Sequence, residues 1–583
     1  MNKDEKKLFE HVRFLYGDDQ AQAIFKKIQA LLEKFKKDHT AFVRMESSEK
    51  ISERDVILIT YGDIVRENSE QPLKTLGRLL RKYLVNEIST VHILPFFPFS
   101  SDDGFSIIDY RKVNPDFGSW DDVSKINQHF QLMFDAVINH CSTQSDIFQG
   151  FLNGDPDKRD YFTVVDSEAD LSQVFRPRAT PVATRFMTKK GEKLVWTTFS
   201  SDQVDLNFRN PAVLLEMIDI LLFYVQHGAE FIRLDAVTYV WKELGTNCIN
   251  LPQTHRFVQL IRTVLDVVAP NVVIVTETNV PHKDNIAYFG DGTNEAQMVY
   301  NFALPFLVLH CFLSEDTKYL TTWADTLDLP SNQTTFLNFL ACHDGIGMLP
   351  IKDILPVDEV EKVVQHVAAR GGFISYKSNG DGTKSPYELN VNYLDAIHPL
   401  YDSEINKDIA VNRFLAAHAI MFALRGIPGI YFHSMFGSRN WAKGVEESGR
   451  YRTINRQKLN FNDLSADLAN SNSIRRPIYE GLMRLLKVRR EEAAFHPFGD
   501  QKIFHLHPSV FSLLRVSPDQ TSRMLCLHNV GNQSVDSTVD LGAIGLDNIS
   551  SLQSTLTSSI LSTQNGSLKF NLDPYEILWL KTK

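Results

Sequence analysis

Eight short runs of continuous apolar residues between residues 56 and 432 constrain the fold of this chain more than any other feature. A polar or glycine-rich loop and then a helical stretch follow each run. The runs are 56–61, 91–94, 132–138, 231–237, 272–277, 298–302, 336–341 and 427–432. Continuous apolar runs are typical of strands buried on both faces. Eight such strands alternating with helices predict an α/β fold, a (β/α)8 TIM barrel over 51–140 and 206–490.

Three other segments depart from this repeat. Residues 1–50 are rich in Lys and Glu and predict a helical N-terminal extension, for which a solvated surface and a dimer contact both stay open. Residues 141–205 are too long for a plain loop and predict an inserted lobe over the barrel mouth. A loop-rich segment is expected near 345–400. Short alternating strands after about residue 500 predict a C-terminal all-β domain over 491–583.

Composition removes several classes of function. Lys and Arg number 61 against 71 Asp and Glu, a formal net charge of −10 without a dense basic block, which argues against nucleic acid or a membrane surface as partner. No run approaches the roughly 18 apolar residues of a membrane span, and the start does not resemble a secretory signal. The five cysteines lack metal-ligand spacing. We expect a cytoplasmic protein, monomeric or homodimeric, with no metal.

Acidic residues stand where several apolar runs end. Asp235 lies near the end of the fourth run, Glu277 closes the fifth, and Asp344 follows the seventh. In a barrel these ends converge on one mouth, where catalytic groups lie. A single buried acid is as often structural as functional. Three at one mouth are costly to bury unless a site uses them, so we expect an active site there.

Two facing carboxylates are the minimum for glycoside chemistry, in which one attacks the anomeric carbon while the other protonates the leaving oxygen. Asp235 and Glu277 follow consecutive predicted strands, so a separation of about 5 Å, as in retaining enzymes, is reachable. Arg233 lies two residues before Asp235 on the same strand face. We expect this cation to keep Asp235 ionised and to lower its pKa, while Glu277 holds a proton.

Four segments, DAVINH, FIRLDAV, TETN and ACHDG, resemble in order the four signature regions of the α-amylase superfamily, glycoside hydrolase family 13. The resemblance implies that Asp235 is the nucleophile, Glu277 the general acid/base and Asp344 the third acid that stabilises the transition state. It implies sugar-positioning roles for Arg233, His140 and His343. Tyr239, beside the nucleophile, either packs or stacks on the sugar.

Further segments resemble the sucrose phosphorylase subfamily, namely LPFFPFSSDDGFSIIDY, RPRATP, HDGIG and GRYRTINRQK. This resemblance implies sugar contacts from Asp102, Phe105 and Arg452. It implies that the loop with Pro177 and Arg178 contacts phosphate and the acceptor. The chain departs from sucrose phosphorylases at Asn279, where they typically carry His, and at Glu388, after Tyr387, where they typically carry Gln.

The resemblance implies a retaining α-glucoside phosphorylase, a glycosyltransferase that reversibly transfers a glucosyl unit from sucrose or glucosylglycerate to inorganic phosphate. The product is α-D-glucose 1-phosphate, formed through a covalent β-glucosyl-enzyme, with phosphate as co-substrate and no other cofactor. The partners are then a small sugar and phosphate. The alternatives are a hydrolase or transglucosidase with the same acids, and a non-catalytic binding barrel. An acidic acceptor would need a cation, for which Lys377, Lys384 and Arg185 are candidates.

Overall fold

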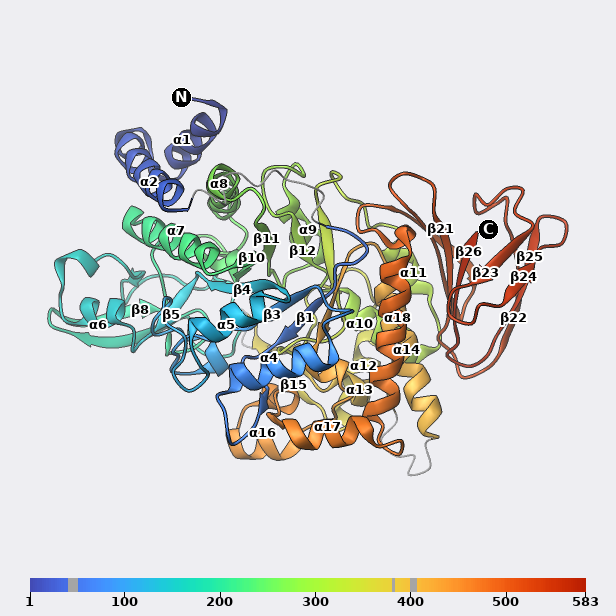
Figure 1. The fold of residues 1–583 in the computed structure, drawn as a ribbon. Helices are drawn as coiled ribbons and strands as arrows, with labels where there is room; N and C mark the ends of the chain where they lie inside the picture. The colour runs from blue at the N-terminus through green and yellow to red at the C-terminus, as the bar shows by residue number, and fades with distance from the viewer. Residues whose placement is uncertain (40–50, 380–382, 399–405, 583) are drawn as a thin grey trace.

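The computed structural model describes residues 1–39, 51–379, 383–398 and 406–582. Its centre is a closed barrel of eight parallel strands (Figure 1). Around the barrel the strands are β1 (Ile57–Thr60), β17 (Ile427–Tyr431), β13 (Thr335–Phe339), β12 (Met298–Tyr300), β11 (Val273–Thr276), β10 (Ala229–Asp235), β4 (Gln131–Val137) and β3 (Thr90–Ile93). Each of these strands overlaps one of the eight predicted apolar runs, which confirms the predicted barrel.

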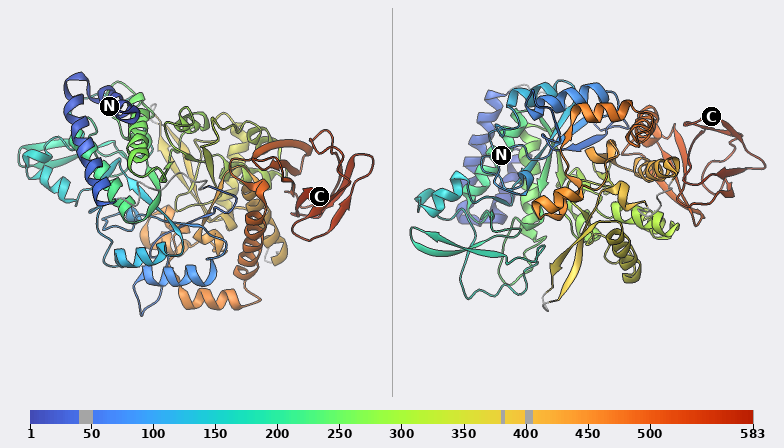
Figure 2. Two further views of the ribbon diagram at one scale, coloured as in Figure 1. Left: turned by 45° about the horizontal axis from the view of Figure 1, so that its top comes forward. Right: turned by 90° about the horizontal axis from the view of Figure 1, so that it is seen from below.

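Helices surround the barrel and cover the outer face of the strands (Figure 2). They are α4 (Pro72–Tyr83), α5 (Trp120–Asn127), α7 (Pro211–Gln226), α8 (Pro252–Val268), α9 (His282–Ile286), α10 (Leu304–Ser314), α11 (Lys318–Ala324), α14 (Lys407–Ala423) and α18 (Arg475–Glu491). Local chemistry fixes their starts: α7 begins with a proline, and the preceding Asn210 side chain accepts from the Ala212 amide.

The inserted lobe lies between β4 and α7. It contains α6 (Asp146–Leu152) and a small sheet of β6 (Val164–Val165), β8 (Gly191–Trp196) and β7 (Ala183–Thr188). At its base β5 (His140–Ser142) pairs antiparallel with β9 (Gln203–Asp205), so that Ser142 lies opposite Gln203 and His140 opposite Asp205. This pairing returns the end of the lobe to the barrel mouth.

The segment that follows β13 holds more regular structure than the loop-rich prediction for 345–400. It contains β14 (Ile346–Gly347), α12 (Val357–Ala369), and a hairpin of β15 (Phe373–Ser378) and β16 (Lys384–Asn390) that pairs with β14. After β17, α16 (Ala442–Ser448) and the short helix η5 (Tyr451–Asn455) complete this side of the mouth.

The two ends of the chain lie on opposite sides of the barrel (Figures 1 and 2). At the N-terminus α1 (Lys3–Tyr16) and α2 (Asp18–Asp38) pack against α7 and α8, and the Tyr16 hydroxyl donates to the Phe208 carbonyl at 2.9 Å. The part of the predicted extension at 40–50 lies outside the described residues.

The C-terminal region folds into antiparallel sheets around a separate apolar core, as predicted. One sheet has the order β19 (Asp500–His507), β20 (Val510–Val516), β21 (Arg523–Asn529), β26 (Ile577–Thr582), β23 (Ser551–Ser554) and β24 (Ile560–Ser562), and β22 (Val535–Asp540) pairs with β25 (Ser567–Leu572). The exact domain boundaries stay predictions. Across the described chain, none of the helices has the length and apolar character that crossing a membrane requires.

Candidate active site

The three predicted acids meet at the carboxyl-terminal mouth of the barrel. Asp235 is the last residue of β10 and Glu277 follows β11 directly. Leu234 and Thr276 are paired in the register of these two strands, so the two carboxylates come from neighbouring strands of the barrel. Asp344 follows β13 and lines the same pocket.

Arg233 organises the floor of this pocket. Its guanidinium is almost fully buried and donates to Asp235 Oδ1 at 2.7 Å and to Asp135. Asp135 is also held by His92, whose Nε2 lies 2.7 Å from Asp135 Oδ2. The Arg233 Nη2 atom lies 4.0 Å from Glu277 Oε2. Arg233 therefore links the predicted nucleophile to the barrel interior and lies near both carboxylates.

The electrostatics of the pair differ from the expectation in one respect. Burial raises the pKa of Asp235 well above its ordinary value, with Arg233 opposing and the Glu277 charge adding to the rise. Arg233 therefore acts in the predicted direction, but desolvation outweighs it, so the predicted net lowering of the Asp235 pKa is wrong. Burial and the Asp344 charge raise the pKa of Glu277, against Arg233. Close carboxylates titrate as a unit, so the pair favours retaining a proton.

The third acid is held ionised by two arginines. Burial alone would raise the pKa of Asp344, but Arg452, with help from His343 and Arg456, holds it below its ordinary value. The Arg452 guanidinium contacts Asp344 and grips Glu388 at both oxygens, at 2.7 and 3.1 Å.

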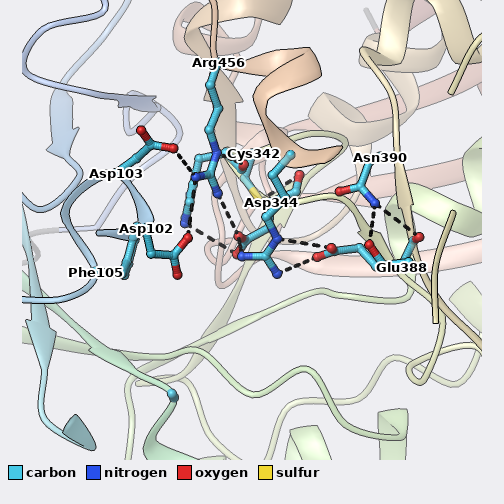
Figure 3. A network of polar contacts seen from close by, with 12 residues as sticks. Asp102, Asp103, Phe105, Cys342, Asp344, Glu388, Asn390 and Arg456 are labelled. Atoms are coloured by element: carbon cyan, nitrogen blue, oxygen red, sulfur yellow. Dashed lines mark hydrogen bonds and ion pairs between the residues drawn. The ribbon is translucent and has the colours of Figure 1, made fainter. Parts of the chain in front are cut away.

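A second arginine braces the same acid from the opposite side. Figure 3 shows Arg456 extending between Asp103 and Asp344. It donates to Asp103 Oδ2 at 2.6 Å and to the His343 carbonyl at 2.8 Å, and lies 3.5 Å from Asp344 Oδ1. A carboxylate held this way keeps its charge and its position.

Most of the predicted sugar-binding residues form one wall. The Phe105 ring stacks on His343, with centroids 4.7 Å apart and planes 4° apart. The His140 Nε2 atom lies 2.9 Å from the Phe105 carbonyl oxygen, and Asp102 accepts from Gln203 at 3.3 Å. Tyr239, in the short helix η3 (Val237–Tyr239), lines the pocket beside them.

Strained backbone lies at two points of this wall. Ala236 has a φ of 52°, in the left-handed region that non-glycine residues seldom adopt, and its amide donates to Glu277 Oε2 at 3.0 Å. Asp102 and Asp103 have φ values of 53° and 50°. Such conformations cost about 1–3 kcal/mol each and cluster at functional sites. The turn after β10 therefore aims a backbone donor at the predicted general acid.

The predicted acceptor side carries an arginine that is flanked by two aromatic rings. Arg178 lies between the rings of Phe199 and Tyr387, with its guanidinium carbon 5.8 Å from each centroid. It donates weakly to the carbonyl of the buried Pro177, at 3.5 Å. Within the described ranges no carboxylate forms an ion pair with it. Asn279 packs closely against Gly347, because a Cβ added at Gly347 would lie 2.5 Å from Asn279 Oδ1.

The structure brings nearly all predicted site residues together. All but Arg233, Pro177 and Glu388 line the central pocket; Arg233 lies behind it, and the other two line an adjoining outer cavity. Sequence reasoning missed Gln203, Phe199 and Phe302 in the lining. These three lie outside every quoted segment, whereas Asp103 and Arg456, which it also missed, lie in the quoted segments 94–110 and 449–458.

A buried lysine organises the back of the pocket. Lys242 Nζ lies 2.6 Å from Asn139 Oδ1 and 2.7 Å from Asp205 Oδ2, and all three side chains are buried. The Asn139 side-chain oxygen therefore accepts a hydrogen bond from an ammonium group.

One further group has possible metal-ligand atoms. In the described part of the chain Cys342, His343 and Asp344 place such atoms within 4.8 Å of one another. Two arginines already contact Asp344, and their positive charge disfavours a cation at that position.

Comparisons with known proteins agree with this geometry. The catalytic-domain model of the α-amylase family matches residues 82–343. A glucosylglycerate phosphorylase of Spirochaeta thermophila is 47% identical over 98% of this chain and 97% of its own, and one of Escherichia coli is 40% identical over 99% and 100%. The crystal structure of a sucrose 6F-phosphate phosphorylase superposes with a TM-score of 0.72 at 25% identity, covering 83% of this chain and 96% of that one.

Proposed function

Because this chain belongs to the α-amylase family and resembles glucosylglycerate phosphorylases over nearly its whole length, we propose that it is a retaining glucoside phosphorylase acting on glucosylglycerate. The reaction reversibly exchanges glycerate for inorganic phosphate on a glucosyl unit and gives α-D-glucose 1-phosphate. The observation that carries the proposal is Arg178, which pairs with no carboxylate of the described residues and lines the same pocket as Asp235, Glu277 and Asp344.

In the first half-reaction Asp235 attacks the anomeric carbon as the bond to the glycerate oxygen breaks. Glu277 gives its proton to that oxygen, and the raised pKa of Glu277 favours the protonated form that this step needs. Once Glu277 is neutral it no longer repels Asp235, and the 2.7 Å hydrogen bond from Arg233 favours the ionised nucleophile. The product is a covalent β-glucosyl-enzyme.

In the second half-reaction phosphate attacks the same carbon from the face that glycerate has left. The bond to Asp235 breaks, the carboxylate is restored, and hydrogen phosphate returns a proton to Glu277. Two inversions give net retention. Asp344 remains ionised throughout, so it can stabilise the positive charge that develops on the sugar.

Arg178 distinguishes phosphate from water as the attacking group. A guanidinium offers planar, paired donors that match a phosphate, and the flanking rings of Phe199 and Tyr387 restrict its movement. A hydrolase would need the acids but not this cation.

The test is release of glucose 1-phosphate from glucosylglycerate and from sucrose, each with and without inorganic phosphate. We expect phosphate-dependent release from glucosylglycerate and little from sucrose. Free glucose at equal rates with and without phosphate would instead show a hydrolase. Phosphate-dependent release from sucrose alone would leave a phosphorylase but overturn the glycerate assignment.

A further inference from the structure

An outer cavity adjoins the catalytic pocket and shares Arg178, Tyr387 and Arg452 with it. Its far wall is formed by Tyr376 of β15 and by Arg450 and Tyr451 at the start of η5. Because the two cavities share these residues, a group that extends from a sugar in the pocket can reach the outer cavity.

The charges of the outer cavity do not cancel. Four arginines line it, and two of them are paired: Arg452 with Glu388 at 2.7 Å, and Arg456 with Asp103 at 2.6 Å. In the described segments neither Arg178 nor Arg450 forms a close ion pair with a carboxylate, although the charge of the exposed Arg450 acts on Asp103. These two cations leave positive charge in the cavity of a protein with net charge −10, and they attract anions locally.

Local structure explains how Arg450 reaches the cavity. α16 is followed by Gly449, whose φ of 66° is the left-handed conformation typical of a glycine that caps the end of a helix. The chain turns there, and Arg450 follows as the residue that precedes η5. The Tyr451 ring stacks on Phe373 of β15, with centroids 4.9 Å apart and planes 14° apart. This stack fixes the segment that carries Arg450 against the hairpin.

The cations that the sequence offered for an acidic acceptor lie elsewhere. Arg185 pairs with Glu192 across the lobe hairpin, and Lys377 Nζ lies 5.7 Å from the Phe175 ring centroid and donates to Asn379. Neither these two nor Lys384 line the catalytic pocket or the outer cavity.

We propose that the outer cavity is the subsite for the carboxylate of the acceptor, and that Arg450 acts with Arg178 to recognise it. The inference rests on the proposed phosphorylase function and adds a residue that determines acceptor specificity. Arg178 is needed again when phosphate enters, whereas Arg450 lies farther out and serves the acid group of the acceptor. Glu388 pairs with Arg452, so among the described arginines of the cavity it is Arg178 and Arg450 that can donate hydrogen bonds to a bound anion.

The experiment runs the reaction in the synthetic direction, from glucose 1-phosphate, with glycerate or with its neutral analogue glycerol as acceptor. Arg450→Gln is expected to lower kcat/KM for glycerate about tenfold, mainly through KM, because a charge-assisted contact of about 1.4 kcal/mol is lost. Use of glycerol, supplied at high concentration, should not change. Arg450→Lys should restore part of the glycerate activity.

A matched control is Arg81→Gln, which removes an exposed arginine on α4 outside both cavities. It should leave both acceptors unaffected. As a second readout, salt should weaken glycerate use in the wild type more than in Arg450→Gln.

Equal effects of Arg450→Gln on both acceptors, or no effect on glycerate, would overturn the role of Arg450 while leaving the phosphorylase intact. A wild type that makes no glucosylglycerate would overturn the proposed function itself, and the inference with it.

Discussion

Replacing Lys242 by methionine tests how the back of the active site is held. The ammonium lies between Asn139 and Asp205, and burial lowers the pKa of Lys242 while Asp205 opposes the shift. Removing one partner of a buried ion pair typically costs about 3–5 kcal/mol. Asp205 would keep hydrogen bonds from Thr198 at 2.8 and 2.6 Å and from Asn139 at 2.9 Å. We therefore expect the free energy of unfolding to fall by about 3 kcal/mol, near the lower end of that range.

The assay is urea unfolding, together with KM for the donor. KM should rise because Asn139 precedes His140 in the pocket wall and Asp205 lies opposite His140 in the β5–β9 pair. The control Lys443→Met removes an exposed lysine that lies 3.5 Å from Glu447, and it should cost no more than about 0.5 kcal/mol.

Adding Asp205→Asn to Lys242→Met removes the uncompensated charge and should recover part of the lost stability. A loss below about 1 kcal/mol for Lys242→Met, or no recovery in the double variant, would refute this reasoning.

Three further variants test the catalytic assignments. Asp235→Asn should lower turnover by about 10⁴-fold or more, and near-wild-type turnover would disprove the nucleophile. Glu277→Gln should raise Tm at neutral pH, because a carboxyl whose pKa is raised in the folded state destabilises the fold above its ordinary pKa. The gain in Tm should vanish below the ordinary pKa of 4.5. A lower Tm of the variant at pH 7 would contradict this. Arg178→Ala should raise KM for phosphate about tenfold or more while cleavage of α-glucosyl fluoride changes little; equal losses in both would count against a phosphate role.

The barrel and its acids could be predicted because their signals are local. An apolar run indicates a buried strand by itself, and parallel strands place Asp235, Glu277 and Asp344 at one mouth whatever the loops do. The resemblance to known motifs added the wall residues, such as Phe105.

What the sequence did not reveal depends on how distant segments meet. Gln203 reaches the pocket because β9 pairs with β5, and Arg450 reaches the outer cavity because the chain turns at Gly449. The predicted direction of the Asp235 pKa shift was also wrong. A sequence shows the neighbouring arginine, but it does not show the extent of burial, whose effect on the pKa is larger.

The central claim is that the glucosyl unit is transferred first to Asp235, as a covalent intermediate, and then to phosphate. The most direct measurement incubates the Glu277→Gln variant with α-glucosyl fluoride, a donor that needs no protonation, and maps the product by peptide mass spectrometry. The account predicts a peptide containing Asp235 that is heavier by one glucosyl unit, and its release by phosphate as α-D-glucose 1-phosphate. An unmodified Asp235 peptide, or release as the β-anomer, would contradict it.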